Sequence, residues 1–505
     1  MKRVFSLATI VASYLWLDSR SFMQKLGERA RLSNLKIPKF LFLAELTGTS
    51  PAYKFVELGE LSKAQELLVE KGKLSISERR LNNRVTQTLS ELRLGPVKNT
   101  VRVARYGEKV KVLYFLTNSL PYTTSGYTKR SHSILEAVID NDVEIQAVTR
   151  MGYPLTIGKW PNGNAQFVDG VKYHRVFPWI FSRRTEKFYE KSVELLSDLA
   201  KDLGVTVIHT TTNFPNAIVA NRVASKLGLP WIYEVRGELE STWLSKLPKD
   251  KQNKAEESEY YRLARQQETS YAKAADAVVV LSDISRKQLV ERGVDPEKIF
   301  VIPNSVEQSL FEKEYDKSEL RRKHGISEGS IVVGTVSSVV QYEGLDTLLK
   351  ALMKLPQQYR GLIVGDGVDK PRLESLAESL GVLSRVDFVG NQNPQTIDEW
   401  YKLLDIFVMP RKDTPVCRTV TPIKALTAQA LGIPVIASDL PALREVTGGI
   451  ESYVIPEDAR DLADKILAAR PHTQGVEWAA SRTWNVAAKN LNSIYQRVFS
   501  SSQAT

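Results

Sequence analysis

The chain has 505 residues, 43% of them hydrophobic and 25% charged, which is ordinary for a globular protein of two or three domains. The single Cys417 excludes an intrachain disulfide framework and a cysteine-based metal cluster, and it favours a reducing cytoplasm. The five histidines lack H-E-x-x-H spacing, so we expect no metal site. Residues 1–110 hold 20 Lys and Arg against 10 Asp and Glu, so they carry +10 of the net charge of +11. Their basic residues are not interleaved with aromatic residues, which argues against a nucleic-acid-binding surface.

Residues 1–108 are predicted to form a mostly helical, basic N-terminal extension that packs against the next domain. The apolar run Val4–Leu17 follows Met1-Lys2-Arg3, but it is too short to span a bilayer and lacks a clear small-x-small cleavage site. Three interpretations stay open for this run: a packing helix, a basic amphipathic helix that touches anionic lipid, and a cleaved signal peptide. Lys54–Lys71, for example, has apolar residues at near-helical spacing, which predicts helical structure there.

Residues 109–305 alternate between short apolar runs and stretches that can hold helices. Such alternation predicts a parallel sheet covered on both faces. A turn-rich loop is expected at Thr117–Gly126, and a helix through Ser131–Ile139. The expected strands are Lys111–Leu116, Val143–Val148, Val207–His209, Trp231–Val235 and Ala277–Ser282.

Residues 306–480 repeat the pattern in a second α/β domain. A hinge region and a surface helix are expected in Glu312–Gly329. Residues 481–505 are expected to form a C-terminal helix, Trp484–Phe499, and a tail. This helix could cross back to the first α/β domain. Ligands of parallel sheets bind where strands end, so the residues after each strand are candidate site residues. The expected strands are Ile331–Ser338, Gly361–Gly367, Val386–Gly390, Ile406–Pro410 and Gly432–Asp439.

Six motifs occur in order along the two α/β domains. They are Thr123–Arg130, Tyr233-Glu-Val-Arg-Gly, Val301-Ile-Pro-Asn-Ser-Val, Gln341-Tyr-Glu-Gly-Leu-Asp, Gly365-Asp-Gly, and Thr421-Pro-Ile-Lys with Gly432–Asp439. No single motif is decisive, but their order and spacing resemble the retaining glycosyltransferases of family 4, in the subgroup with Tyr-Glu-Val-Arg-Gly and Tyr-Glu-Gly-Leu-Asp. The resemblance covers about residues 109–500. It implies the GT-B fold, in which an acceptor-binding and a nucleotide-sugar-binding Rossmann-like domain face each other across a cleft.

In the first domain, Gly126 lies on the loop between a strand and a helix, where a small residue lets backbone N–H groups approach a phosphate or sugar hydroxyl. Arg130, one turn later, could reach the same anion. Glu234 and Arg236 end a strand and could share one face of it. Where much of the family has a histidine, this pair could be the catalytic and sugar-contacting residues, or a structural ion pair.

In the second domain, the family's Gly-Arg…Lys-Gly pair, which neutralises the nucleotide diphosphate, is replaced by Ser338 and Glu343. Two phosphates in a partly dry site require other cationic donors. The nearest candidates in the sequence are Arg411, Lys412, Arg418 and Lys424. Of these we favour Arg411 and Lys424 as donor-binding residues, with exposed surface charge as the alternative.

The family's paired glutamates are also absent, because Thr419 and Thr427 stand at those positions. A threonine cannot grip two ribose hydroxyls as a carboxylate does. Asp413 could reach in from the loop as a substitute.

Three further residues lie in motifs that the resemblance places at the donor: Tyr342, Gly367 and Asn391. Asn391 follows a strand whose end meets the nucleotide base in relatives through main-chain groups. Such contacts do not specify uracil or guanine.

The function implied by the resemblance is transfer of a sugar with retention from a nucleoside-diphosphate sugar, UDP being favoured over GDP, to an envelope polysaccharide or glycolipid. No cofactor or metal is expected, since the leaving phosphate helps to deprotonate the acceptor in such enzymes. The expected location is the cytoplasm or the inner face of the membrane, with peripheral contact to anionic lipid. The alternatives are a catalytically inactive GT-B partner that binds acceptor or scaffolds an active transferase, and a sugar-nucleotide epimerase. The sequence leaves open the donor sugar, the acceptor, the linkage and the oligomeric state.

Overall fold

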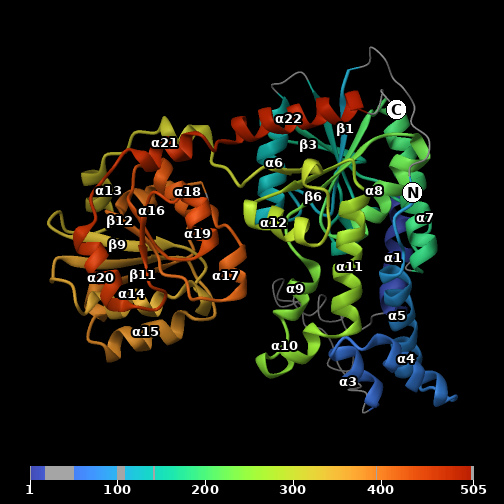
Figure 1. Cartoon of the computed structure of the whole chain (residues 1–505), viewed down its shortest axis with the longest axis horizontal. Helices are drawn as coiled ribbons and strands as arrows, with labels where there is room; N and C mark the ends of the chain where they lie inside the picture. The colour runs from blue at the N-terminus through green and yellow to red at the C-terminus, as the bar shows by residue number, and fades with distance from the viewer. Residues whose placement is uncertain are drawn as a thin grey trace. The chain divides into compact units, whose positions relative to one another are not determined.

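The computed structural model describes residues 2–17, 50–98, 109–139, 143–182, 184–393 and 395–501. The chain divides into two compact units. Unit 1 comprises Met1–Val280, Leu289–Phe300 and Leu491–Thr505, and unit 2 comprises Leu281–Gln288 and Val301–Asn490. Figure 1 labels many of the helices and some of the strands of both units. No helix in the described ranges has the length and hydropathy that a bilayer-spanning segment needs.

Unit 1 is built on an eight-stranded sheet with the order β3-β4-β2-β1-β5-β6-β7-β8. Its strands are β1 (Lys111–Leu116), β2 (Glu144–Thr149), β3 (Ala165–Val168), β4 (Val171–His174), β5 (Val207–Thr211), β6 (Trp231–Val235), β7 (Ala277–Val280) and β8 (Ile299–Val301). The neighbours β4-β2-β1-β5-β6-β7 pair in parallel, and β3 and β4 form an antiparallel hairpin. The expected strands are therefore present, whereas the hairpin was not predicted.

Helices of unit 1 follow its strands or precede the sheet in sequence. They are α1 (Lys2–Leu17), α3 (Pro51–Glu57), α4 (Leu61–Glu70), α5 (Ile76–Leu92), α6 (Gly126–Ile139), η2 (Leu155–Ile157), α7 (Thr185–Asp202), α8 (Phe214–Leu227), α9 (Leu239–Leu244), α10 (Lys249–Glu256), α11 (Glu259–Ala274), α12 (Asp283–Glu291) and η3 (Pro296–Lys298). The first residues of α12 belong to unit 2.

The N-terminal helices pack within unit 1. Helices α4 and α5 contact α11, and α1 contacts α5 (Figure 1). Helix α1 also contacts η2. The segment Lys54–Lys71 is helical as expected, in two helices, because α3 ends at Glu57 and α4 begins at Leu61. Gly59 separates them at φ 81°, a left-handed conformation that ends a helix and favours glycine.

Unit 2 is built on a six-stranded sheet with the order β11-β10-β9-β12-β13-β14, and every recorded strand pair in it is parallel. Its strands are β9 (Ile331–Val336), β10 (Tyr359–Val364), β11 (Val386–Gly390), β12 (Ile406–Met409), β13 (Val435–Ser438) and β14 (Ser452–Val454). The described helices are η4 (Gln308–Phe311), α13 (Lys317–Lys323), η5 (Gln341–Glu343), α14 (Leu345–Leu352), α15 (Lys370–Ser379), η6 (Leu383–Arg385), α16 (Ile397–Leu403), α17 (Pro415–Thr419), α18 (Ile423–Ala430), α19 (Pro441–Val446), α20 (Ala459–Ala468), α21 (Gln474–Ala480) and α22 (Trp484–Ser501), whose last turns belong to unit 1.

The sheet of unit 2 is buried on both faces. Val332 and Phe407 belong to one apolar core, whereas their chain neighbours Val333 and Val408 belong to another. Successive strand residues point to opposite faces, so the continuous β-branched runs in the sequence supply both cores. The mixed α/β fold with two Rossmann-like domains is confirmed.

Candidate functional site

Three loops that follow strands of unit 2 pack backbone to backbone. A Cβ added to Gly344 would lie 1.9 Å from the carbonyl oxygen of Pro410, and one added to Gly367 would lie 2.1 Å from that of Val339. Gly344 also has a φ of 69°, and Val339 N donates to Asp366 O at 3.0 Å. Glycine is required here because any side chain would push the loops apart. These contacts hold the ends of β9, β10 and β12 together.

The buried carboxylate of Glu343, in η5 after β9, joins the two predicted cations of this edge. Arg411, after β12, donates to it from Nη2 to Oε1 at 2.9 Å and from Nε to Oε2 at 3.2 Å. Lys424, in the first turn of α18, donates from Nζ to Oε1 at 2.7 Å. We call these three residues the Glu343 cluster. Two positive groups share one negative group, so the cluster keeps an excess positive charge.

The pKa shifts in the cluster follow from burial and mutual attraction. Burial alone would raise the pKa of Glu343, but the positive charges of Arg411 and Lys424 outweigh it and hold the pKa below its ordinary value. Burial alone would lower the pKa of Arg411, but Glu343 outweighs it and raises the pKa. Burial dominates at Lys424 and lowers its pKa, although Glu343 opposes the change.

The other candidate cations of this loop have separate partners. Lys412 Nζ lies 3.1 Å from Asp346 Oδ2 and 3.3 Å from Glu457 Oε1. Arg418 and Asp413 form an exposed ion pair, with Nε 2.5 Å from Oδ1. Asp413, expected as a substitute for the absent glutamates, is thus bound by Arg418.

The two threonines at the glutamate positions bond to their own helices. Thr419 Oγ1 donates to Pro415 O at 3.1 Å, and Thr427 Oγ1 donates to Ile423 O at 3.2 Å. Thr427 lies three residues after Lys424 on α18, so both lie on one side of the helix. The position of the absent carboxylate therefore adjoins the Glu343 cluster.

The remaining candidates of unit 2 lie at the same edge of the sheet. Ser338 follows β9, Gly367 follows β10, and Asn391 follows β11; the side chains of Ser338 and Asn391 are exposed. Tyr342 is half-exposed, and its ring centroid lies 5.9 Å from the guanidinium carbon of Arg411. The carboxyl ends of neighbouring parallel strands thus gather all the predicted donor-binding residues of this unit.

In unit 1, Arg130, Glu234 and Arg236 form a buried ion network. Arg130 donates to Glu234 Oε1 from Nε at 3.0 Å and from Nη2 at 2.8 Å. Arg236 Nη2 donates to Glu234 Oε2 at 2.7 Å, and Tyr114 OH donates to the same oxygen at 2.5 Å. Both carboxylate oxygens are therefore occupied by buried donors. These contacts favour the structural ion pair over a catalytic role for Glu234 and Arg236.

His209 extends this network and was not singled out from the sequence. Its ring stacks on that of Tyr114 with centroids 4.3 Å apart, and its Nδ1 lies 2.7 Å from Tyr495 OH in α22. Burial lowers the pKa of His209 to about 3, so the ring is neutral at physiological pH. Its position in the middle of an apolar strand was the only signal in the sequence.

Gly126 begins α6 in open surroundings, since a Cβ there would meet nothing within 4 Å. Ser125 and Thr128 cap this helix reciprocally: Thr128 N donates to Ser125 Oγ at 3.2 Å, and Ser125 N donates to Thr128 Oγ1 at 2.8 Å. Arg130 lies one turn further but binds Glu234, so it does not join Gly126 as expected.

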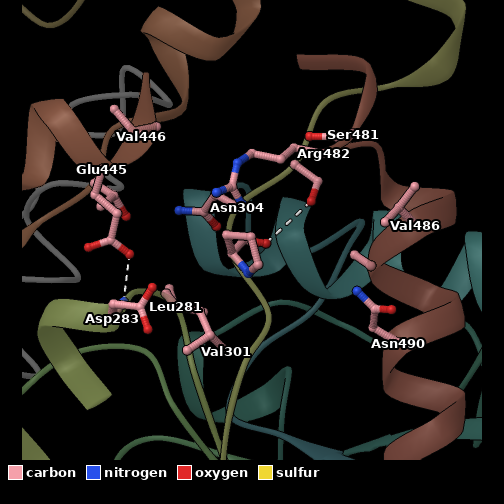
Figure 2. A pocket seen from close by; sticks show the side chains of 14 residues that line it. Leu281, Asp283, Val301, Asn304, Glu445, Val446, Ser481, Arg482, Val486 and Asn490 are labelled. Carbon is pink, nitrogen blue, oxygen red and sulfur yellow. Dashed lines mark hydrogen bonds between the residues drawn. The ribbon is translucent and has the colours of Figure 1, made fainter. Parts of the chain in front are cut away.

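A separate cavity of about 240 Å³ in unit 2 lies beside Asp283, Asn304, Glu445 and Arg482 (Figure 2). The carboxylate of Glu445 accepts from the backbone N of Asp283 at 2.6 Å. Burial raises the pKa of Glu445, and the guanidinium of Arg482 stacks 3.9 Å from the ring centroid of Trp478. The cavity is smaller than the usual 300–1,000 Å³ or so of a ligand pocket, so we do not assign it to a nucleotide sugar.

Comparisons with known sequence families assign both α/β domains. Residues 125–305 match the family described as "Glycosyl transferase 4-like domain", and residues 316–469 match "Glycosyl transferases group 1". Both α/β domains are glycosyltransferase domains of the GT-B class.

The similar curated proteins are themselves glycosyltransferases or glycolipid synthases. The glycosyltransferase domains are 29% identical over 210 residues to a D-inositol 3-phosphate glycosyltransferase of Geodermatophilus obscurus, covering 39% of this chain and 45% of that protein. They are 26% identical over 296 residues to an alpha-monoglucosyldiacylglycerol synthase of Streptococcus pneumoniae, covering 57% and 64%. The chain thus spans about half to two thirds of the length of these relatives.

Solved structures show the same fold at low identity. Sucrose-phosphate synthase from Thermosynechococcus elongatus aligns with a TM-score of 0.57 at 20% identity, over 77% of this chain and 100% of that one. Anabaena HepE in complex with UDP aligns with a TM-score of 0.55 at 16% identity, over 77% and 100%.

Proposed function

We propose that the chain transfers a sugar, with retention of anomeric configuration, from a nucleoside-diphosphate sugar to a glycan or glycolipid of the cell envelope. The observation that carries this proposal is the Glu343 cluster, which holds two cations where β9 and β12 end. Parallel sheets bind ligands at this edge, and a diphosphate requires cationic donors there. The match of both domains to glycosyltransferase families, and the names of relatives that act on inositol phosphate and diacylglycerol, support the same reaction class.

Within the Glu343 cluster, the two cations have different capacities for a new partner. An ammonium has three N–H donors, and Lys424 has one recorded bond, to Glu343. Arg411 already directs Nε and Nη2 to Glu343. We therefore assign direct phosphate contact to Lys424. Arg411 holds Glu343 in place and contributes part of the positive charge. UDP is the favoured leaving group, supported by the solved complexes of HepE with UDP and UDP-glucose.

The transfer itself breaks the bond from the anomeric carbon to the diphosphate oxygen and forms one to the acceptor oxygen on the same face. The acceptor proton goes to the departing phosphate. Negative charge grows on the diphosphate as the bond breaks, and a fixed cation stabilises that charge more in the transition state than in the ground state. Gly126 at the open start of α6 offers backbone N–H groups to an acceptor hydroxyl or phosphate.

A second candidate, a catalytically inactive partner that binds acceptor or scaffolds an active transferase, is favoured by the two threonines. Neither Thr419 nor Thr427 supplies the carboxylate that would hold the ribose, and both bond to their own helix. This candidate predicts that the chain binds no nucleotide.

A nucleotide panel separates the two candidates. We expect UDP to raise the melting temperature of the full chain, with slow hydrolysis of a UDP-sugar. Thr427→Glu should enlarge the UDP shift, corresponding to about tenfold tighter binding, because a carboxylate bonded to hydroxyls contributes about 1.5–3 kcal/mol. Thr396→Glu, which adds the same charge at an exposed position of unit 2, is the control. If neither the native chain nor Thr427→Glu responds to any nucleotide, the inactive partner is the better assignment.

We further propose that the transfer takes place at the inner face of the cell membrane, where α1 and two neighbouring loops contact lipid. Five large apolar side chains of these segments are 51–74% exposed: Val4, Phe5, Trp160, Trp179 and Ile180. We call these five residues the apolar patch. Tryptophan and aliphatic side chains of this kind favour the membrane interface.

Helix α1 is held beside these loops by specific bonds. Ser6 Oγ donates to Pro178 O at 2.8 Å, and Phe181 N donates to Thr9 Oγ1 at 3.0 Å. The rings of Phe5 and Trp179 meet edge to face at 6.3 Å. Exposed apolar residues are therefore fixed in one surface, and two of them, Val4 and Phe5, belong to residues 1–110, which carry +10 of the net charge of +11. This combination supports an anionic bilayer as the partner.

Vesicle binding tests this surface. We expect the full chain to sediment with vesicles that contain phosphatidylglycerol more strongly than with phosphatidylcholine alone, and less strongly as salt rises. Trp160→Ser with Trp179→Ser should weaken binding about 100-fold or more, since each buried aromatic contributes about 1.5–3 kcal/mol. Val368→Ser, at a residue of unit 2 that is 91% exposed, should have no effect. Equal vesicle binding by the double variant and the native chain would show that the apolar patch is not part of the membrane interface.

A further inference from the structure

Three side chains of unit 1 with metal-binding groups converge at one point outside the Glu343 cluster. His132 and Glu136 are one turn apart on α6, and Asp169 lies between β3 and β4. One ligand atom from each residue lies within 4.8 Å of the others. The proposed transfer reaction uses none of these three side chains.

Two of the three separations match the edges of a tetrahedral metal site, and the third, between Glu136 and Asp169, is below 4.8 Å. His132 Nε2 lies 3.3 Å from Asp169 Oδ2 and 3.6 Å from Glu136 Oε1. Zinc bonds of about 2.0–2.2 Å at tetrahedral angles place ligand atoms about 3.3–3.6 Å apart. A direct N–H···O bond prefers about 2.9–3.0 Å. The 3.3 Å contact is a long hydrogen bond and the 3.6 Å contact is too long for one, and both distances also fit one ion shared by the ring nitrogen and the two oxygens.

Tyr173 fixes the orientation of the imidazole. Its hydroxyl lies 2.8 Å from His132 Nδ1, and the two rings are nearly parallel, at 19° with centroids 6.1 Å apart. With Nδ1–H donating to the phenol oxygen, Nε2 presents its lone pair toward the carboxylates. Metal-binding histidines usually have their second nitrogen held in this way.

The hairpin turn holds Asp169 next to this nitrogen. Asp169 and Gly170 have φ values of 46° and 82°, as in a two-residue turn that requires left-handed residues. The side chain of Asp169 is mostly exposed while that of His132 is buried, so water has access to one side of the cluster. Two carboxylates directed at one point repel each other unless a cation lies between them.

We propose that His132, Glu136 and Asp169 bind one divalent transition-metal ion of the zinc class, which fastens the β3–β4 hairpin to α6. One imidazole with two carboxylates suits zinc, whereas magnesium and calcium prefer oxygen-only ligand sets. The fourth position faces solvent and accepts water. This ion stabilises the local structure and takes no part in the transfer of the sugar.

Calorimetry on the untagged full chain, stripped with chelator and titrated with Zn²⁺, tests the proposal. We expect one ion per chain, a higher melting temperature with Zn²⁺, and a visible spectrum of tetrahedral type with Co²⁺. Asp169→Asn and His132→Gln should abolish binding, and Tyr173→Phe should weaken it about tenfold. Asparagine accepts the left-handed backbone of residue 169, so Asp169→Asn should fold normally.

Two variants serve as matched controls. Glu144→Gln removes a partly exposed carboxylate of neighbouring β2, and His472→Gln removes the histidine that pairs with Glu451 in unit 2. Both should retain the ion. Loss of Zn²⁺ in His472→Gln with retention in His132→Gln would overturn the assignment, as would the absence of saturable binding. Displacement of Zn²⁺ by equimolar Ca²⁺ or Mg²⁺ would overturn the zinc class.

Discussion

Replacing Lys424 by alanine should abolish the UDP-induced rise in melting temperature and lower kcat/KM for sugar transfer by about 100-fold or more. The reason is the growth of charge on the leaving diphosphate. A fixed donor aimed at a developing charge contributes about 10²–10³ in rate, and more in a site from which water is excluded. Lys424 has one recorded bond for its three N–H donors, so two remain for the diphosphate and its loss removes a direct contact. The measurements are differential scanning fluorimetry with UDP and release of UDP in the presence of acceptor.

Lys350→Ala is the matched control for this experiment. Lys350 lies on α14 of the same unit, is half-exposed, and approaches Asp346 only to 3.9 Å. Its removal changes the net charge equally without touching the Glu343 cluster, so the UDP shift should stay unchanged. A Lys424→Ala protein that folds and keeps its full UDP shift would exclude Lys424 from the donor site.

Glu234→Gln should lower the melting temperature of unit 1 by about 10 °C, because it leaves Arg130 and Arg236 without their buried counter-charge. Removing one partner of a buried ion pair typically costs about 3–5 kcal/mol, and 1 kcal/mol corresponds to about 2–4 °C in a unit of this size. Glu194→Gln, at a half-exposed surface glutamate, should change the melting temperature little. Thermal unfolding followed by circular dichroism measures both.

The same variant has a defined pH dependence. Burial alone would raise the pKa of Glu234, but the charges of Arg236 and Arg130 outweigh it and hold the pKa far below the ordinary value of 4.5. A carboxylate with a lowered folded-state pKa contributes its full stabilisation above the unfolded value and loses it as pH falls through the folded one. The difference between native chain and Glu234→Gln should therefore be constant above about pH 5 and shrink in acid.

The outcome also separates the two interpretations of the buried network. A large loss of stability with transfer activity preserved at low temperature assigns Glu234 to the structure. Unchanged stability with a loss of kcat would instead indicate a catalytic role for Glu234. Adding Arg130→Met to Glu234→Gln should recover part of the lost stability, because a double variant buries one less unpaired cation.

Local pattern was sufficient for most elements of the fold. The β-branched runs at Ile331–Val336 and Ile406–Met409 predicted strands because burial on both faces of a parallel sheet requires continuous apolar residues. Periodicity did not show where a single residue interrupts a helical pattern. Within Lys54–Lys71, the left-handed φ of Gly59 ends α3 and separates it from α4, although the apolar spacing is helical throughout. The β3–β4 hairpin was missed because its alternation spans only four residues on each side of the turn.

In the candidate site too, the sequence identified individual residues but not their partners. Arg411 and Lys424 were selected from their loop and motif, but their shared partner Glu343 lies 68 and 81 residues away in the chain, respectively. The choice of Arg130 as an anion-binding residue did not foresee Glu234, which lies 104 residues later and occupies its guanidinium.

The sequence by itself determined the α/β class, the positions of the strands and the identity of the cationic residues near their ends, because these depend on neighbours within a few residues. Only the tertiary structure decided which charges neutralise one another and which side chains converge. It joined His132 on α6 to Asp169 in the hairpin, and Tyr495 in α22 to His209 in β5. The physical reason is that ion pairing and ligand convergence depend on distances in space of a few ångströms, which periodicity along the chain does not encode.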